Sequence, residues 1–144
     1  MDFQLKNMSY KGLILLALAI IGITFWYTNG LANELKKEEK NKVEIWAKAT
    51  EALAEALGSN LANETSDFTF PLGVVESNTT IPAILVDDNG VINSSVNLTA
   101  DLESELKLIK KKYPDQRIEI TLIDDKKNYI YYKDSKLLQR LKYF

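Results

Sequence analysis

An uncharged apolar run near the N-terminus constrains this chain more than any other feature. Residues 12–28, GLILLALAIIGITFWYT, contain no charged side chain, and Thr24 is the only clearly polar residue in the interior of the run. As a helix the run spans about 25 Å, against about 30 Å for a hydrocarbon core, and Leu31 just beyond it extends the reach. Trp26 and Tyr27 stand at one end, where aromatic rings favour the headgroup layer. The run predicts a transmembrane helix over 12–28.

A cleaved signal peptide is the alternative to a permanent anchor. The start carries Lys6 and Lys11, and GLA at 30–32 is an acceptable cleavage site. The apolar run exceeds the usual signal core of about 7–15 residues and the helical pattern continues past the site, which favours an uncleaved anchor. Lysines lie on both sides of the run, with more after it than before it. The positive-inside rule alone therefore favours the topology with the N-terminus outside, and charge leaves the orientation open.

Composition excludes several function classes. The 144 residues suffice for an anchor and a domain of about 100–120 residues. Without Cys or His there is no disulfide, Cys/His zinc site, thiol nucleophile, Ser-His-Asp triad or phosphorylated histidine on this chain. The net charge is near zero, so nothing predicts nucleic-acid binding, and residues 61–100 contain no Lys or Arg, which argues against a phosphate-binding face in that stretch. We predict no metal, no cofactor and no catalysis, because the acidic pairs Asp87/Asp88 and Asp124/Asp125 fit turns better than acid–base chemistry.

A long helix is predicted directly after the apolar run. The segment 31–57 lacks proline and glycine, and one stripe repeats at alternating steps of three and four. Two interpretations stay open: an amphipathic helix packed on its own domain, or a helix that pairs with a second copy of itself. Gly58-Ser59-Asn60 is a plausible C-cap. The stripe, and with it the candidate homodimer contact, consists of Val43, Trp46, Thr50, Leu53 and Leu57.

The remaining sequence predicts two hairpins separated by a helix. Residues 81–86 are almost wholly apolar, as in a strand buried on both faces, and 87–90, DDNG, predict a tight turn. A helix follows, with Thr99 as its expected cap, Leu102, Leu106 and Ile109 as its buried stripe and a solvated lysine end at 110–112. RIEITLI and YIYYK predict the second hairpin. Residues 66–71 fit a short helix or a loop equally well. The predicted fold class is α+β with a small antiparallel sheet.

The chain ends in a second amphipathic helix. Asp134 and Ser135 predict its start, and the segment 134–144 mixes leucines with basic residues before aromatic Tyr143 and Phe144. It is either a packing helix of the domain or the start of a helix that leads to a second, missing membrane segment.

Two segments carry a family resemblance. SNTTIPAILVDDNGVI at 77–92 and NYIYYKDSKLLQRLKYF at 128–144 resemble, together with the long helix, the N-terminal sensor region of transmembrane histidine kinases common in Bacteroidetes. The IPxxLxDxxG pattern also looks like the first hairpin of PAS-like or Cache-type sensors. The resemblance implies a two-component input module, truncated before its second membrane helix, in the bacterial inner membrane. It places residues 1–11 in the cytoplasm and 29–144 in the periplasm, with a sensor domain over 29–133.

The resemblance further implies signalling through paired helices that respond to a small molecule or an envelope protein. Candidate ligand contacts are the polar groups beside the sheet, Thr79, Thr80, Tyr129 and Tyr131. Two rivals differ in class. A pilin-like subunit depends on a Glu early in the apolar run, which residues 12–28 lack. A membrane-tethered structural or assembly protein would act through the 31–57 helix alone.

Overall fold

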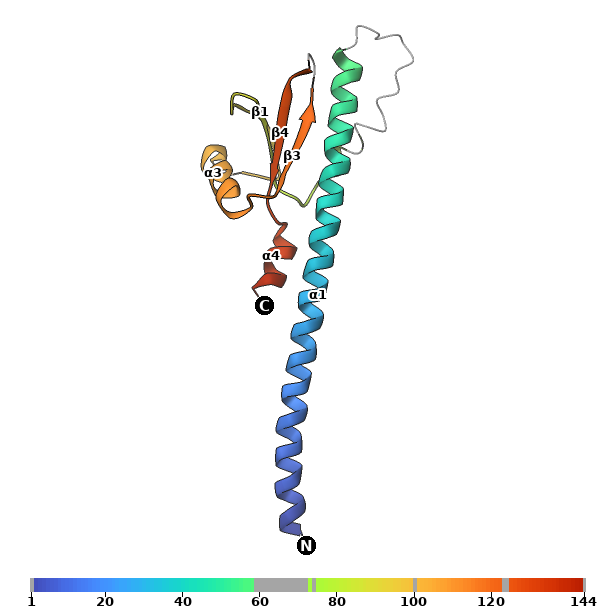
Figure 1. Cartoon of the computed structure of the whole chain (residues 1–144), viewed down its shortest axis with the longest axis vertical. Coiled ribbons are helices and arrows are strands. Elements are labelled where there is room, and N and C mark those ends of the chain that lie inside the picture. The colour runs from blue at the N-terminus through green and yellow to red at the C-terminus, as the bar shows by residue number, and fades with distance from the viewer. Residues whose placement is uncertain (1, 59–72, 74, 100, 123–124, 144) are drawn as a thin grey trace.

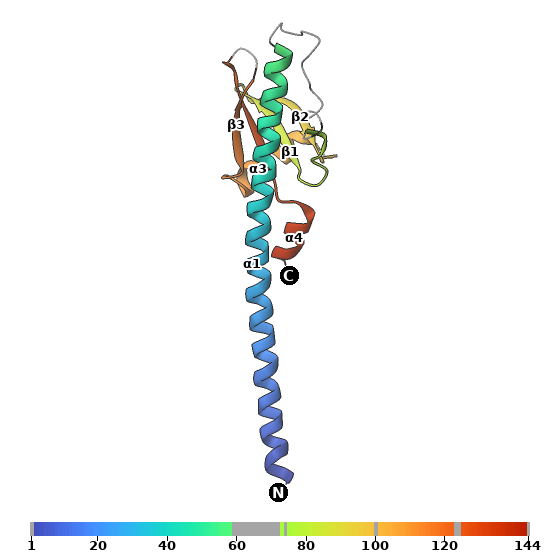
Figure 2. The same ribbon diagram turned by 90° about the vertical axis from the view of Figure 1, so that its right-hand side faces the viewer.

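One continuous helix forms the length of the molecule. The computed structural model describes residues 2–58, 73, 75–99, 101–122 and 125–143, with side chains from Ser9 onward. Helix α1 spans Asp2–Gly58 without a break, and the small domain lies against its C-terminal half (Figures 1 and 2). The helix is long and apolar enough to cross a membrane, and its apolar window packs against nothing within the chain. Its large side chains there face outward, as Leu15 at 68% and Phe25 at 70% exposure illustrate.

The domain is built on a four-stranded antiparallel sheet. Strands β1 (Ala83–Asp87), β2 (Ile92–Val96), β3 (Arg117–Thr121) and β4 (Lys127–Tyr132) lie in the order β2-β1-β4-β3. Each hairpin pairs its own strands, and β1 and β4 join the two hairpins through the register Leu85 opposite Ile130. The predicted α+β class with two hairpins is confirmed.

The sheet lies between two helices, one on each face. On one side the sheet's Ala83, Leu85 and Ile130 pack with Val43 and Trp46 of α1. The opposite side packs against helix α3, Leu102–Lys112, which buries Leu106 and Ile109. Central strand β1 is therefore covered on both faces, which explains its unbroken apolar run.

The cap of α3 differs from the prediction. The helix begins at Leu102, and its N-cap is Asp101 rather than Thr99. One Asp101 oxygen accepts a hydrogen bond from the Glu103 backbone N at 3.3 Å, and the other accepts from the Ser104 hydroxyl at 2.7 Å. A carboxylate satisfies two donors at the positive helix end, which makes aspartate the stronger cap here.

The turn between β1 and β2 follows the predicted chemistry. Asp87 Oδ1 accepts hydrogen bonds from the backbone N of Asn89 at 2.9 Å and of Val91 at 2.8 Å. Gly90 has φ +82°, in the left-handed region that favours glycine. The Asp87 carboxylate is thus engaged in shaping the turn.

Helix α4, Lys136–Lys142, confirms the predicted helix start, with Ser135 as its N-cap. It returns along α1 toward the apolar segment, so that the two helices run side by side in both views (Figures 1 and 2). Three predictions concern positions outside the described residues: the segment 66–71, the C-cap at Ser59-Asn60, and Asp124 of the second acidic pair.

Candidate functional site

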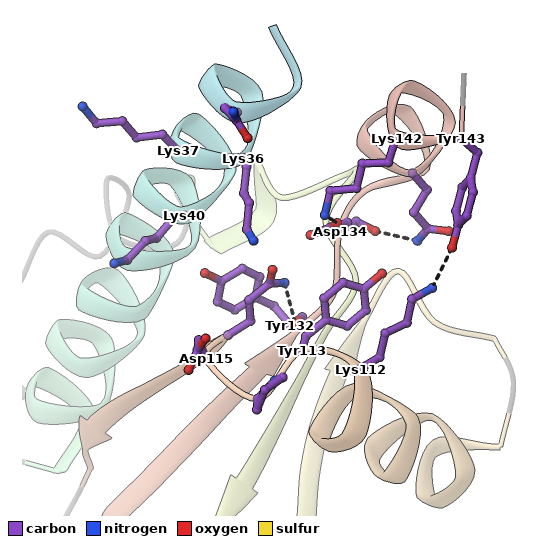
Figure 3. Close-up of a pocket in the computed structure, with 14 residues that line it drawn as sticks. Lys36, Lys37, Lys40, Lys112, Tyr113, Asp115, Tyr132, Asp134, Lys142 and Tyr143 are labelled. Carbon is purple, nitrogen blue, oxygen red and sulfur yellow. Dashed lines mark hydrogen bonds and ion pairs between the residues drawn. The ribbon is translucent and has the colours of Figure 1, made fainter. Parts of the chain in front are cut away.

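A cavity of about 540 Å³ opens where α1, α4 and the turn before β3 meet. It lies beside α4, on the side of the sheet domain that faces the apolar segment (Figure 1), and Figure 3 shows the side chains that line it. Its size is within the range of about 300–1,000 Å³ typical of small-molecule sites. It is lined by Asn33, Lys36, Lys37, Lys40, Lys112, Tyr113, Pro114, Asp115, Gln116, Tyr132, Asp134, Gln139, Lys142 and Tyr143.

Backbone and amide hydrogen bonds fix the floor of the cavity. Gln116 Nε2 donates to the Tyr132 carbonyl at 3.1 Å, and the Tyr132 backbone N donates to the Gln116 carbonyl at 3.2 Å. The Gln116 backbone N in turn donates to the Tyr113 carbonyl at 3.1 Å, which closes the turn after α3. These bonds attach the turn to the end of β4, so the floor is a rigid part of the sheet.

Buried Asp134 connects the floor to α4. This residue is 1% exposed, and its carboxylate forms an ion pair with Lys142 at the far end of the helix. Its carbonyl accepts a hydrogen bond from Gln139 Nε2 at 2.8 Å. A buried carboxylate is costly without a counter-ion, so Lys142 holds α4 in this position.

A second buried carboxylate attaches α4 to α1. Glu39, 4% exposed, accepts a hydrogen bond from the Ser135 backbone N at 3.1 Å and another from the Ser135 hydroxyl. The same Ser135 oxygen accepts from the Leu138 backbone N at 3.3 Å. The negative charge faces the positive end of α4, which adds favourable electrostatics to the hydrogen bonds.

The cavity lining is strongly cationic. Figure 3 shows Lys36 reaching into the space, whereas the ends of Lys37 and Lys40 extend away from it. Lys112 Nζ donates to the Tyr143 hydroxyl at 3.3 Å, and this bond, with the charges of neighbouring tyrosines, raises the pKa of Lys112. The opposite wall thus holds a second ammonium group.

Tyr132 contributes a hydroxyl that stays protonated. The residue is 5% exposed, and burial raises its pKa to about 12, with a further contribution from the carboxylates of Glu44, Asp134 and Glu39. A phenol with this pKa remains neutral, and so able to donate a hydrogen bond, at every physiological pH.

The predicted ligand contacts lie apart from this cavity. Thr79 and Thr80 are exposed in the loop before β1. Tyr129 and Tyr131 are half-buried on β4, where Arg117 stacks on the first ring at 5.0 Å and Lys110 on the second at 5.1 Å. None of the four lines the cavity, and Tyr131 packs under α3. Their ligand role stays a prediction.

The predicted dimer stripe is largely part of the domain core. Val43 is 1% exposed and Trp46 6%, and Trp46 Nε1 donates to the Val75 carbonyl at 3.1 Å. Thr50 and Leu53 are half-buried, and Leu57 is 68% exposed. The helix is therefore packed on its own domain, and within one chain the sheet covers Val43 and Trp46. The paired-helix role of the five residues stays a prediction.

Sequence reasoning missed the residues that form the cavity. In the sequence the lysines after the apolar run bear only on the topology, and those at 110–112 indicate a solvated helix end. A partial signal was present, because Lys112 and Lys142 lie at the C-terminal ends of α3 and α4, whereas Lys36 lies inside α1. Buried Glu39 lies in a charged run that gives no sign of its burial.

Comparisons with known proteins add no identification. No protein-family model, curated protein or solved structure matches the chain. Its class is thus the one its own structure defines: a small α+β domain, with strand order β2-β1-β4-β3 and one helix on each face of the sheet, joined to a long apolar helix.

Proposed function

We propose that this chain is the membrane-anchored extracytoplasmic input module of a two-component sensor histidine kinase, with a PAS- or Cache-like domain. The observation that carries the proposal is the course of the two helices. Helix α1 connects the apolar segment to the domain, and α4 leaves the domain and returns toward that segment. A domain that is entered and left at its membrane side can move one helix against the other.

The end of α4 lies beside the C-terminal end of the apolar segment, across a groove. A groove of about 380 Å³ between them is lined by Ile21, Phe25 and Thr28 on α1 and by Leu141 and Lys142 on α4. A helix that continues α4 would run beside residues 12–28, as a second membrane crossing requires. The proposed signal is a shift of α4 along α1, transmitted through the bond between Glu39 and Ser135.

We further propose that two copies pair through the face of α1 opposite the sheet. Ile45 is 57% exposed although the adjacent Trp46 is buried, and Ala52, two turns on, is exposed on the same face as Ile45. Pairing there leaves the core contacts of Val43 and Trp46 intact. A tethered assembly protein would use the same face, so dimerisation alone does not separate it from the sensor.

Topology tests the extracytoplasmic location. The chain contains no cysteine, so single substitutions at exposed positions label without background. In spheroplasts expressing the full chain, a membrane-impermeant maleimide should label Ser94→Cys on β2 and leave Ser9→Cys unlabelled. Lysed cells provide the control, in which both should react. The opposite pattern would place the domain in the cytosol and end the proposal.

The sequence of the native gene tests the proposed link to a histidine kinase. We expect the reading frame to continue past codon 144 into about 20 apolar residues and then a histidine-bearing dimerisation helix with an ATP-binding domain. A stop codon at that point would favour the tethered assembly protein instead.

A further inference from the structure

We propose that the cavity between α1, α4 and the 113–116 turn binds a phosphate-bearing anion. The inference deepens the proposed function, because it names the ligand class that the input domain would detect. Binding itself requires only the cavity, so it can be measured separately from signalling.

Charge is the first argument. Five lysines and two aspartates line the cavity; the ends of Lys37 and Lys40 extend away from it, and Lys40 pairs with Glu44, so Lys36, Lys112 and Lys142 are the ammonium groups nearest the space. The Asp134 carboxylate is already paired with Lys142. Among the described residues Lys36 forms no ion pair, although it points into the cavity. Lys36 and Lys112 line the cavity from different helices, and an anion between them would interact favourably with both ammonium groups.

The cationic side chains of the lining favour phosphate over carboxylate as the ligand. All five cationic groups of the lining are lysines, whose compact ammonium groups bind phosphate as point charges. Planar carboxylates are more typically held by the arginine fork, and Arg140 lies outside this lining. The Tyr132 hydroxyl adds a neutral hydrogen-bond donor to the lining, beside the lysines. At about 540 Å³ the cavity has room for the organic part of a phosphate ester.

The position permits two sources of the same chemistry. Lys36 lies eight residues after Thr28, about 12 Å along the helix axis, which is near the outer edge of a headgroup layer. Lys142 lines both this cavity and the apolar groove beside Phe25, so a lipid could place its headgroup in one and a chain in the other. A soluble phosphate ester could enter from the open side.

Such a ligand would act on the helices directly. An anion that contacts Lys36 and Lys142 together connects α1 to α4, and it binds best when the two helices are close. This differential affinity is what a ligand needs to shift a conformational equilibrium.

The experiment follows thermal unfolding of the full chain in nanodiscs. A Trp26→Phe background leaves Trp46 as the only tryptophan, so its fluorescence reports the domain core. One arm titrates sodium phosphate against sodium chloride of equal ionic strength in phosphatidylcholine discs. The other replaces part of the phosphatidylcholine with phosphatidylglycerol. Lys36→Gln/Lys112→Gln is the test variant, and Lys48→Gln, an exposed lysine outside the cavity, is the matched control.

We expect the unfolding midpoint to rise in one arm, and that arm identifies the source of the phosphate group. In the double variant the affinity for that ligand should be at least about tenfold weaker, whereas Lys48→Gln should bind it like the parent chain. No rise in either arm overturns the inference. An equal rise in the double variant does so too, because it shows a general salt or surface effect. If the maleimide labelling placed the domain in the cytosol, the proposed sensor function would be excluded, but a positive binding result for the cavity would still hold.

Discussion

The carboxylate of Glu39 holds Ser135 by two hydrogen bonds, although 96 residues separate them in sequence. Both residues are buried, and Ser135 is the N-cap of α4. The contact therefore connects the helix that enters the domain to the helix that leaves it. In the proposed function this is the bond through which a movement of the domain reaches both helices.

Removal of the Glu39 carboxylate should lower the free energy of unfolding of the domain. In Glu39→Ala the Ser135 amide and hydroxyl lose their acceptor inside the protein, and we expect a loss of about 2–4 kcal/mol in the free energy of unfolding. Glu39→Gln keeps one acceptor and should lose about half of that. Chemical unfolding of the full chain in detergent, in the Trp26→Phe background so that the fluorescence comes from Trp46, measures both. Exposed Glu38→Ala is the control and should stay within about 0.5 kcal/mol. Equal stability of Glu38→Ala and Glu39→Ala would contradict the contact.

Neighbouring residues of α1 should separate pairing from folding. Ile45→Glu places a charge on the exposed face, and we expect a folded monomer where the parent is a dimer. Trp46→Glu buries a charge against the sheet and should abolish the folded domain. Light scattering of the full chain, corrected for detergent, gives the mass, and circular dichroism reports folding. An unchanged mass for Ile45→Glu would exclude this face as the dimer contact.

Loss of the Lys142 ammonium should destabilise the domain. Lys142→Met leaves the buried Asp134 carboxylate without its counter-ion, and we expect a cost of about 1–3 kcal/mol, reduced because Lys142 itself reaches solvent. Lys136→Met, an exposed lysine on the same helix, should change stability by less than about 0.5 kcal/mol. Equal effects in urea unfolding would show that the ion pair contributes nothing specific.

Alkaline pH should weaken the fold through Tyr132. The unfolded phenol loses its proton near pH 10 and the folded one near pH 12, so the unfolded state binds fewer protons between these values. The free energy of unfolding should then fall by about 2 kcal/mol from pH 10 to 12, with no contribution from this group below pH 10. In Tyr132→Phe this part of the slope should vanish. Parallel stability curves for the two proteins would refute the assignment.

The sheet could be predicted because its signals are local. Residues 81–86 are continuously apolar because α1 and α3 cover both faces of β1, and Asp87 and Gly90 specify their turn by short-range bonds. The start of α4 was also readable from Ser135, since a cap acts within one turn of its helix.

The cavity and the buried carboxylates depend on distant partners. Glu39 reads as one more solvated acid among lysines, and only the return of α4 buries it. Likewise the stripe of Val43 and Trp46 has the same periodicity whether it packs on a sheet or on a second helix. Periodicity identifies an apolar face and not what covers it, which is why the partner of this face was open until the fold was known.

Because α1 is continuous, a change in the tilt of its membrane segment would move the sheet domain with it. From Thr28 to Gly58 the helix extends about 45 Å without a break and contains no proline that would kink it. A change of only about 10° in the tilt of the lower part would swing the far tip by about 8 Å. Bilayer thickness, which sets helix tilt, would thus be converted into a displacement of the sheet relative to the membrane surface.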